Sequence, residues 1–178
     1  AEGASGSYTV SLTSPAQTAV TVNLTYAGTA ANGTDFTGVA TVTILAGDSS
    51  ASFNIDTIND LIDEVAAESF TVSVTSATGG NFENLVVSGS NNSVTTAITD
   101  NDNAPTISVS SPTVAEAGGF AQFTLSLSNP SSTATTVSLA LANLTATGGG
   151  TDYGSAAATN LQVSTDGGTT WSNATSAT

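Results

Sequence analysis

The sequence contains no lysine, arginine or histidine, although 14 of its 178 residues are aspartate or glutamate. The formal net charge is −14, and no side chain can form an ion pair with another. Charge of one sign opposes a compact state through self-repulsion, so we expect cations from the solvent to neutralise it. The same absence argues against nucleic acid and anionic lipid as partners, because no side chain can neutralise a phosphate.

Cysteine is also absent, and no hydrophobic run approaches the roughly 18 residues of a membrane-spanning helix. We therefore expect no direct membrane insertion. A secreted domain without disulfides needs another source of stability, and bound metal is a common one. Because histidine, cysteine and lysine are missing, the usual general bases and covalent nucleophiles are missing too, and the sequence predicts a protein that is not an enzyme.

Hydrophobic residues make up 39% of the chain and charged residues only 8%, a balance that favours a folded core over disorder. Hydrophobic residues alternate with threonine and serine, as in Tyr8-Thr-Val-Ser-Leu12 and Phe70-Thr-Val-Ser-Val74. A period of two is typical of half-buried antiparallel strands. The one helix-like stretch, 61–68, is short and acidic, and we interpret it as a loop. The sequence thus predicts an all-β protein.

The second half of the chain repeats motifs of the first. Tyr8–Leu12 is matched by Phe123–Leu127, and Gly33-Thr-Asp-Phe36 is matched by Gly150-Thr-Asp-Tyr153. The spacing is that of a whole domain. The stretch 100–105 has no hydrophobic alternation and ends in proline, which is typical of a domain boundary. We predict a first domain over 1–102, a linker over 103–105 and a second domain over 106–178.

The two repeats are not in the same register. A strand-like stretch, 106–110, precedes Glu116 in the second repeat, whereas no such stretch precedes Glu2 in the first. The second repeat also ends before the counterpart of 53–98. We therefore expect the first domain to lack its first strand, the second to be the first part of a repeat, and the chain to come from a longer array.

Several stretches together carry a family resemblance. They are Val20–Thr25, Gly33–Gly38, Ile44–Asp48, Asn59-Asp60, Glu68–Val72 and Ile98–Asp102. With these stretches the chain resembles a Calx-beta domain over nearly all of 1–102 and, more weakly, over 106–178. The resemblance implies tandem immunoglobulin-like antiparallel β-sandwiches, the second truncated. It also implies calcium binding and an occurrence in large bacterial surface adhesins.

The resemblance further implies which residues bind Ca²⁺ at one end of the sandwich. The matching positions in the first repeat are Glu2, Asp35, Asp60, Asp63 or Glu64, Glu68, Asp100 and Asp102, and those in the second repeat are Glu116 and Asp152. The family usually has an acidic residue three positions before Glu68, but this chain has Val65 there. Calcium takes six to eight oxygen ligands, and loop carboxylates at one pole of a sandwich supply them. The alternative is that these acidic loops only maintain solubility.

The stretch 164–171, Ser-Thr-Asp-Gly-Gly-Thr-Thr-Trp, fits the Asp-box pattern and resembles hairpins of sialidase propellers. A sialidase needs arginine to hold its substrate, and this chain has none. We interpret the stretch as a tight hairpin turn stabilised by Asp166. A Trp171 that stacks on a sugar is the alternative.

The leading hypothesis is a calcium-stiffened spacer of a large secreted or cell-surface adhesin, with calcium ions and neighbouring repeats of the same chain as partners. The alternatives are a glycan- or protein-binding module, or an accessory domain of a secreted hydrolase. Under the leading hypothesis, any cell-surface or glycan ligand would be bound elsewhere in the parent protein. The expected location is extracellular.

Overall fold

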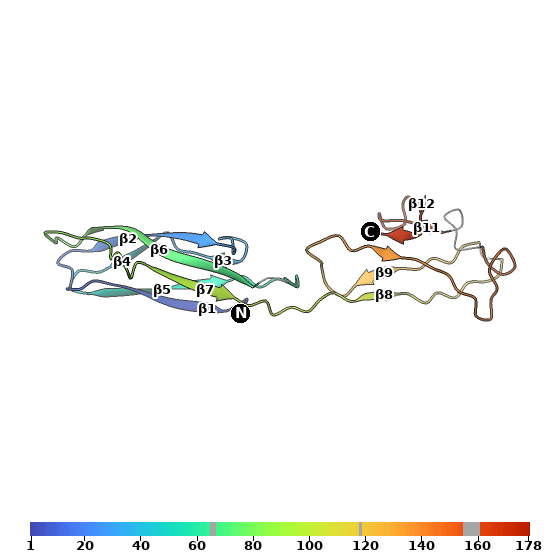
Figure 1. Ribbon diagram of the computed structural model, residues 1–178, viewed down its shortest axis with the longest axis horizontal. Helices are drawn as coiled ribbons and strands as arrows, with labels where there is room; N and C mark the ends of the chain where they lie inside the picture. The colour runs from blue at the N-terminus through green and yellow to red at the C-terminus, as the bar shows by residue number, and fades with distance from the viewer. Residues whose placement is uncertain (65–66, 118, 155–160) are drawn as a thin grey trace. The chain divides into compact units, whose positions relative to one another are not determined.

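The structure is a computed structural model that describes residues 1–64, 67–117, 119–154 and 161–178. The chain divides into two compact units, Ala1–Asn103 (unit 1) and Ala104–Thr178 (unit 2) (Figure 1). All pairings between the named strands are antiparallel, and the described residues contain no helix, so none long and hydrophobic enough to cross a membrane occurs there. The all-β class predicted from the alternation is confirmed.

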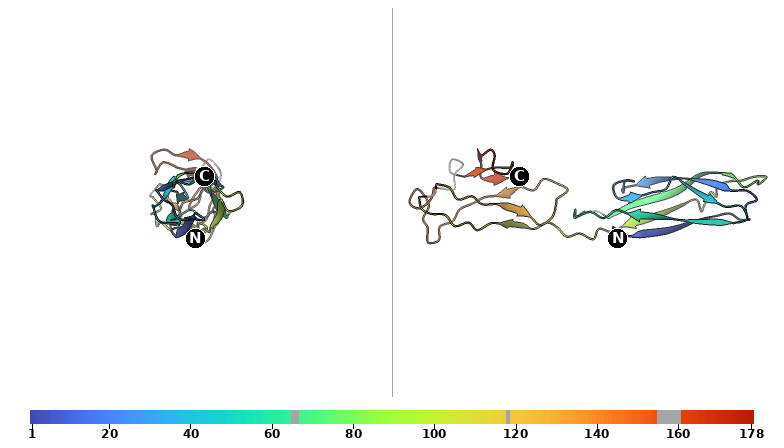
Figure 2. Two further views of the ribbon diagram at one scale, coloured as in Figure 1. Left: turned by 90° about the vertical axis from the view of Figure 1, so that its left-hand side faces the viewer. Right: turned by 180° about the vertical axis from the view of Figure 1, so that it is seen from behind.

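Unit 1 is a sandwich of two antiparallel sheets (Figures 1 and 2). One sheet has the strand order β1-β5-β3 and the other β4-β2-β6-β7. The strands are β1 (Ser5–Ser11), β2 (Val20–Gly28), β3 (Phe36–Thr37), β4 (Thr41–Ile44), β5 (Ser50–Thr57), β6 (Glu68–Gly79) and β7 (Ser93–Ile98). In this order β1 and β7 are edge strands of their sheets.

The alternating pattern of the sequence sets which side chains face the core. Along β2, the side chains of Val20, Val22 and Leu24 are buried, whereas Thr21 and the other intervening residues point outward. A register shift between Asn23 and Leu24 marks a bulge in the β2–β6 pairing. Each strand contributes one apolar face, which is how half-buried antiparallel sheets form a common core.

The centre of the core is aromatic. Phe36 and Phe70 are 0% and 1% exposed, and their rings stack with centroids 4.2 Å apart. Tyr26 packs against both rings and donates a hydrogen bond from its hydroxyl to the Val39 carbonyl at 2.8 Å. The buried hydrophobic residues are Ala16, Val20, Val22, Leu24, Ala30, Phe36, Val42, Ile44, Ile55, Phe70, Val72 and Ile98.

Glycine allows β2 and β6 to approach closely at both ends of their pairing. Gly28 has φ 150°, and a Cβ there would lie 2.2 Å from the Ser69 carbonyl oxygen. Gly79 has φ 102°, and a Cβ there would lie 2.3 Å from the Ala19 carbonyl oxygen. Any side chain at these two positions would push the central strands apart.

Unit 2 consists of three small two-stranded sheets. They pair β8 (Ile107–Val109) with β9 (Leu125–Leu127), β10 (Val137–Ser138) with β13 (Ser176–Ala177), and β11 (Gln162–Val163) with β12 (Ser172–Asn173). None of the side chains described between residues 104 and 178 is buried. Phe120 and Leu144 are 89% and 94% exposed. Unit 2 therefore has local strand pairs without a closed core.

Candidate metal centre

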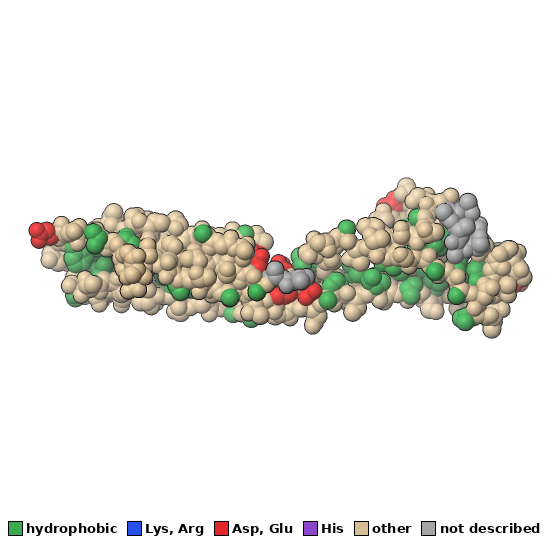
Figure 3. All heavy atoms as spheres, in the orientation of Figure 1, with side chains coloured by type: hydrophobic (Ala, Val, Ile, Leu, Met, Phe, Trp, Pro, Cys, Tyr) green, Lys and Arg blue, Asp and Glu red, His purple; other side chains and the backbone are tan. Residues whose placement is uncertain are grey.

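Three segments of unit 1 meet where β7 ends. The backbone N–H of Glu2 donates to the Thr99 carbonyl at 3.0 Å, which holds the start of the chain against the end of β7. Ala4 is fixed to β5 in turn, because its N–H donates to Thr57 Oγ1 at 2.9 Å and its carbonyl accepts the Thr57 N–H at 2.8 Å. The loop between β5 and β6 reaches the same end, where carboxylates gather on the surface (Figure 3).

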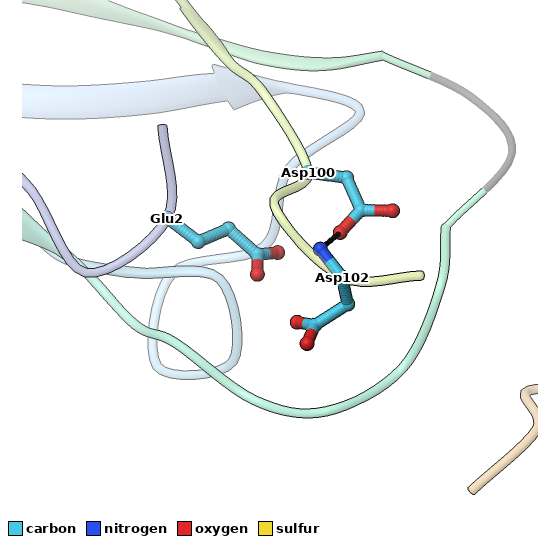
Figure 4. Close-up of side chains that lie close together, drawn as sticks. All are labelled: Glu2, Asp100 and Asp102. Carbon is cyan, nitrogen blue, oxygen red and sulfur yellow. Dashed lines mark hydrogen bonds between the residues drawn. The ribbon is translucent and has the colours of Figure 1, made fainter. Parts of the chain in front are cut away.

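The centre of this pole is formed by Glu2, Asp100 and Asp102. One carboxylate oxygen of each lies within 4.8 Å of the others, and all three side chains are half-buried. Figure 4 shows the Glu2 carboxylate pointing across toward the turn that carries the two aspartates. Among the described residues, no other group of three or more carboxylates has ligand atoms this close together.

Asp100 is held in place by backbone donors. Its Oδ1 accepts the N–H of Asp102 at 2.8 Å, and its Oδ2 accepts the N–H of Glu64 at 2.7 Å. These hydrogen bonds lower the pKa of Asp100 because they stabilise its charged form, and the bond from the Asp102 N–H has the largest effect. The Glu64 bond also ties the loop between β5 and β6 to the end of β7.

Three carboxylate oxygens at this pole lack a hydrogen-bond partner although solvent does not reach them. They are Glu2 Oε2, Glu68 Oε2 and Asp102 Oδ2, the only such side-chain atoms in the described part of the chain. A shielded carboxylate oxygen without a partner is costly, because it has lost water and gained no donor. A cation held by Glu2, Asp100 and Asp102 would satisfy the shielded oxygens of Glu2 and Asp102, so these three residues fit a metal ion.

The surrounding carboxylates extend this negative pole. Partial burial raises the pKa of Glu2, and the charges of Asp60 and Asp100 raise it further. Burial likewise raises the pKa of Glu64, followed by the charge of Asp35. Like charges close together disfavour ionisation unless a cation neutralises them.

Glu68, the first residue of β6, lies beside the turn that carries Asp35. Burial raises the pKa of Glu68, and the neighbouring charges of Asp35 and Glu64 raise it further. Asp35 itself accepts the Ala31 N–H through Oδ2 at 2.5 Å, which closes its turn. The turn before β3 and the start of β6 therefore contribute to the same pole.

Two residues outside the expected ligand set connect the loops of the pole. The side-chain amide of Asn101 donates to Asn59 Oδ1 at 2.9 Å. Asn59 also donates from its own amide to the Asp60 carbonyl at 2.8 Å. Each asparagine stands next to an aspartate in the sequence, which is the signal that could have identified it.

Seven of the residues expected to bind metal thus lie at one pole: Glu2, Asp35, Asp60, Glu64, Glu68, Asp100 and Asp102. Asp63 does not appear in the contacts that connect them, and Val65 lies outside the described residues. In unit 2, Glu116 is exposed, and Asp152 accepts the Thr147 N–H at 2.7 Å in a turn of its own. The structure does not bring these two together in a metal-sized group.

The donor set determines which ion the pole suits. All the candidate ligands are carboxylate oxygens, and the chain has no cysteine or histidine. Oxygen ligands in number suit Ca²⁺, whereas Zn²⁺ prefers sulfur and nitrogen. Mg²⁺ demands a smaller and more regular octahedral site.

The Asp box forms the turn between β11 and β12. Asp166 accepts hydrogen bonds from the N–H groups of Thr169 and Thr170 at 3.0 and 2.9 Å. The Trp171 indole N–H donates to the Gly168 carbonyl at 3.1 Å, so its polar group is used within the hairpin. The stretch is the hairpin expected from the sequence.

Fold and pole together define an acidic all-β sandwich module with a cluster of carboxylates at one end. Over residues 1–101 the chain matches the LapA domain family and belongs to it; LapA is a large bacterial surface adhesin. Residues 100–170 match the Calx-beta domain family. The resemblance to Calx-beta repeats of large adhesins is thereby confirmed, with the Calx-beta match in the second stretch and the LapA match in the first. Both are typically non-catalytic domains.

Comparison with solved structures gives a match to the "Crystal structure of calcium binding domain CBD12 of CALX1.1". The identity is 25% and the TM-score 0.46, over 55% of this chain. The match spans 38% of the length of that structure. No curated protein matches the chain.

Proposed function

We propose that this chain is a calcium-binding structural spacer from a large secreted or cell-surface adhesin. The observation that carries the proposal is the convergence of Glu2, Asp100 and Asp102 to within 4.8 Å, with shielded oxygens of Glu2 and Asp102 that lack partners. No cationic side chain exists to neutralise them. A bound Ca²⁺ would supply the missing positive charge and would coordinate the oxygens that lack hydrogen-bond partners.

Calcium would act by fixing loops that otherwise repel one another. Its ligands would come from the start of the chain, from the loop between β5 and β6, and from the residues after β7. Asp100 and Asp102 also stand just before Pro105, which fixes its own φ and restricts Ala104 to extended conformations. Ligation would thus set the direction in which the chain leaves unit 1, which suits a spacer.

Isothermal titration calorimetry and thermal melting of the whole chain test this proposal. Calcium should bind and raise the melting temperature of unit 1, whereas magnesium should act weakly. Asp100→Asn should reduce calcium binding at least about tenfold, since a charged ligand is lost. Asp48→Asn changes an acidic residue in the turn between β4 and β5, two strands of different sheets, and should leave calcium binding unchanged. Equal melting temperatures in chelator and in millimolar calcium would refute the proposal.

Small-angle scattering tests the spacer role separately. In calcium, the distribution of overall dimensions of the whole chain should be narrower than in chelator, because the direction in which the chain leaves unit 1 is fixed. If calcium binds but the scattering curve is the same in both conditions, the metal is a local staple and the stiffening role is wrong.

A further inference from the structure

The edge strands of the two sheets of unit 1 leave a cleft between them. The edge strand β1 and the edge strand β7 face each other, and the Tyr8 hydroxyl is hydrogen-bonded to Thr96 Oγ1 across this gap at 2.7 Å (Figure 1). Beyond Tyr8, away from the acidic pole, a cleft of about 410 Å³ opens. Its lining is largely apolar and includes Val10, Leu12 and Phe53.

This cleft extends from the surface into the core. Its walls reach Ile44 and Val72, which are 0% and 5% exposed, while Val94 on its rim is 48% exposed and Val86 is 72% exposed. Hydrophobic side chains thus stand open beside an edge strand that has no neighbour on one side in the described structure. Proteins usually cover such an edge, because its free N–H and C=O groups pair readily with another strand.

Unit 2 shows what covers the equivalent edge. The stretch Phe123–Leu127 repeats Tyr8–Leu12, and its strand β9 pairs with β8. In that pairing, Ile107 stands opposite Leu127 and Val109 stands opposite Leu125. The same register on β1 would place an isoleucine opposite Leu12 and a valine opposite Val10, both of which line the cleft.

The backbone hydrogen bonds of the two units are consistent with this register, because they show which residues of each strand face the neighbouring strand. In unit 2, Ser110 N–H donates to the Thr124 carbonyl at 2.9 Å, and Ser128 N–H donates to the Thr106 carbonyl at 3.0 Å. Residues 124, 126 and 128 of unit 2 correspond to Thr9, Ser11 and Thr13 of unit 1.

In unit 1, the alternate residues bond to β5. Leu12 N–H donates to the Ser49 carbonyl at 2.7 Å, and Thr57 N–H donates to the Ala4 carbonyl at 2.8 Å. The pairing between β1 and β5 is continuous from Ser5 to Ser11. Because antiparallel bonds alternate along a strand, Thr9 and Ser11 direct their backbone groups away from β5. These are the positions that a strand like β8 would use.

We propose that unit 1 accepts one additional antiparallel strand on the free edge of β1, over this cleft. The occupant is an extended segment of the β8 type, Thr-Ile-Ser-Val-Ser, whose two hydrophobic side chains enter the cleft. Backbone bonds to Thr9 and Ser11 provide the affinity, and the alternate hydrophobic residues provide the selection. This inference does not depend on calcium, since the acidic pole lies at the other end of β1.

The first experiment uses a peptide with the sequence of residues 104–112 and the whole chain. Binding should slow amide hydrogen exchange at Thr9 and Ser11 by about tenfold or more. A peptide carrying Ile107→Asn and Val109→Asn should not bind. Ser11→Pro should abolish binding while the β1–β5 pairing persists, because proline is tolerated on an edge whose N–H faces outward.

A second variant keeps the test decisive if peptide binding is weak or if Ser11→Pro does not fold. The sequence of residues 106–114 is added directly before Ala1, which reproduces the Val-Ala-Glu stretch 114–116 at the junction. The extended chain should melt about 5 °C higher or more, in calcium and in chelator alike. An extension carrying the same two asparagine substitutions is the matched control.

Equal melting temperatures of the two extended chains, with no protection at Thr9 and Ser11, would overturn the proposal. A fluorescent apolar dye that binds the cleft and is not displaced by the peptide would also overturn it, because the cleft would then be a small-ligand site.

Discussion

Units 1 and 2 share local motifs but differ in what they bury. Asp35 of unit 1 accepts the N–H of Ala31, four residues before it, and Asp152 of unit 2 accepts the N–H of Thr147, five residues before it. The glycine two residues earlier closes each turn, since Gly33 and Gly150 donate to the carbonyls of the following aromatic residues. Nevertheless, unit 1 buries a core and the described part of unit 2 buries no side chain.

The aromatic residues after these turns show the difference. Phe36 is fully buried against Phe70, whereas its counterpart Tyr153 is half-buried and its hydroxyl is hydrogen-bonded to Asn143. A turn forms from a few neighbouring residues, but a core needs strands that are distant in sequence. In unit 1 those strands are β6 and β7.

The acidic pole depends on the same two strands. Glu68 begins β6, and Asp100 follows the end of β7. Core and pole are thus built together: the strands that bring Phe70 onto Phe36 also bring the carboxylates to one end. Unit 2 has a matching turn aspartate, Asp152, but no matching pole among its described residues.

The largest expected effect is on the core. Phe70→Ala should lower the free energy of unfolding of unit 1 by about 3–5 kcal/mol, because it leaves a cavity beside Phe36. Phe123→Ala in unit 2 is the matched control, and its side chain is 51% exposed. That variant should change stability by less than about 0.5 kcal/mol. Chemical denaturation followed by circular dichroism measures both, and a similar loss in both variants would show that unit 2 also has a cooperative core.

The next effect concerns calcium. At a hundred times its Kd, calcium should stabilise unit 1 by about 2.7 kcal/mol. Asp102→Asn should remove most of this gain, and Asp152→Asn should remove none. Differential scanning calorimetry with and without calcium separates the variants. If Asp152→Asn abolishes the gain, unit 2 holds the metal and the assignment to unit 1 is wrong.

Strand positions were largely predictable because hydrophobic alternation records which face of each strand is buried. The alternation in Tyr8–Leu12 and Phe70–Val74 gives strands in the structure. It failed to predict how far strands extend in unit 2, where Phe123 precedes β9 and is half exposed. Strand length there depends on partners that alternation does not specify.

The sequence predicted which acidic residues gather at one pole, but not the contacts that hold them in place. Acidic residues at strand ends indicated a pole, and seven of those residues lie there in the structure. The sequence could not show that Asp100 would be held by the Glu64 N–H, or that Asn59 and Asn101 would bond. Those contacts depend on the path of the loop between β5 and β6, which no local pattern encodes.

A smaller effect is expected from pH in chelator. The pKa values of Glu2, Glu64 and Glu68 are raised in the folded state, so this state binds more protons than the unfolded chain above about pH 4.3. The free energy of unfolding should therefore rise as pH falls from 7 toward 5. The lowered pKa of Asp100 opposes this rise in the free energy of unfolding only below about pH 3.9.

Calcium should reverse this dependence on pH, because protons compete for the carboxylates that bind it. Thermal melts from pH 7 to pH 5, in chelator and in calcium, measure both slopes. Slopes of the same sign in the two conditions would contradict the assignment of these glutamates to the metal pole.

The smallest expected effect is local to the Asp-box hairpin of unit 2. Hydrogen bonds to Asp166, chiefly that from the Thr170 hydroxyl, lower the pKa of Asp166. The contribution of Asp166 to the stability of the hairpin is therefore present above about pH 3.9 and is lost as pH falls through the lowered pKa. Asp166→Ala removes the acceptor for the Thr169 and Thr170 N–H groups. Their amide exchange should accelerate about tenfold, since a two-stranded hairpin is only marginally stable without its turn.

The Trp171 emission should shift to the red in the same variant, because its indole N–H loses the carbonyl of Gly168 when the turn opens. The melting temperature of unit 1 should not change, since the hydrogen bonds that the structure describes for Asp166 all lie within its own hairpin. Asp48→Ala, in a turn of unit 1, is the control that should leave Trp171 unaffected. A lower melting temperature of unit 1 in Asp166→Ala would mean that the two units fold as one, and the contrast between a closed core and independent local hairpins would no longer hold.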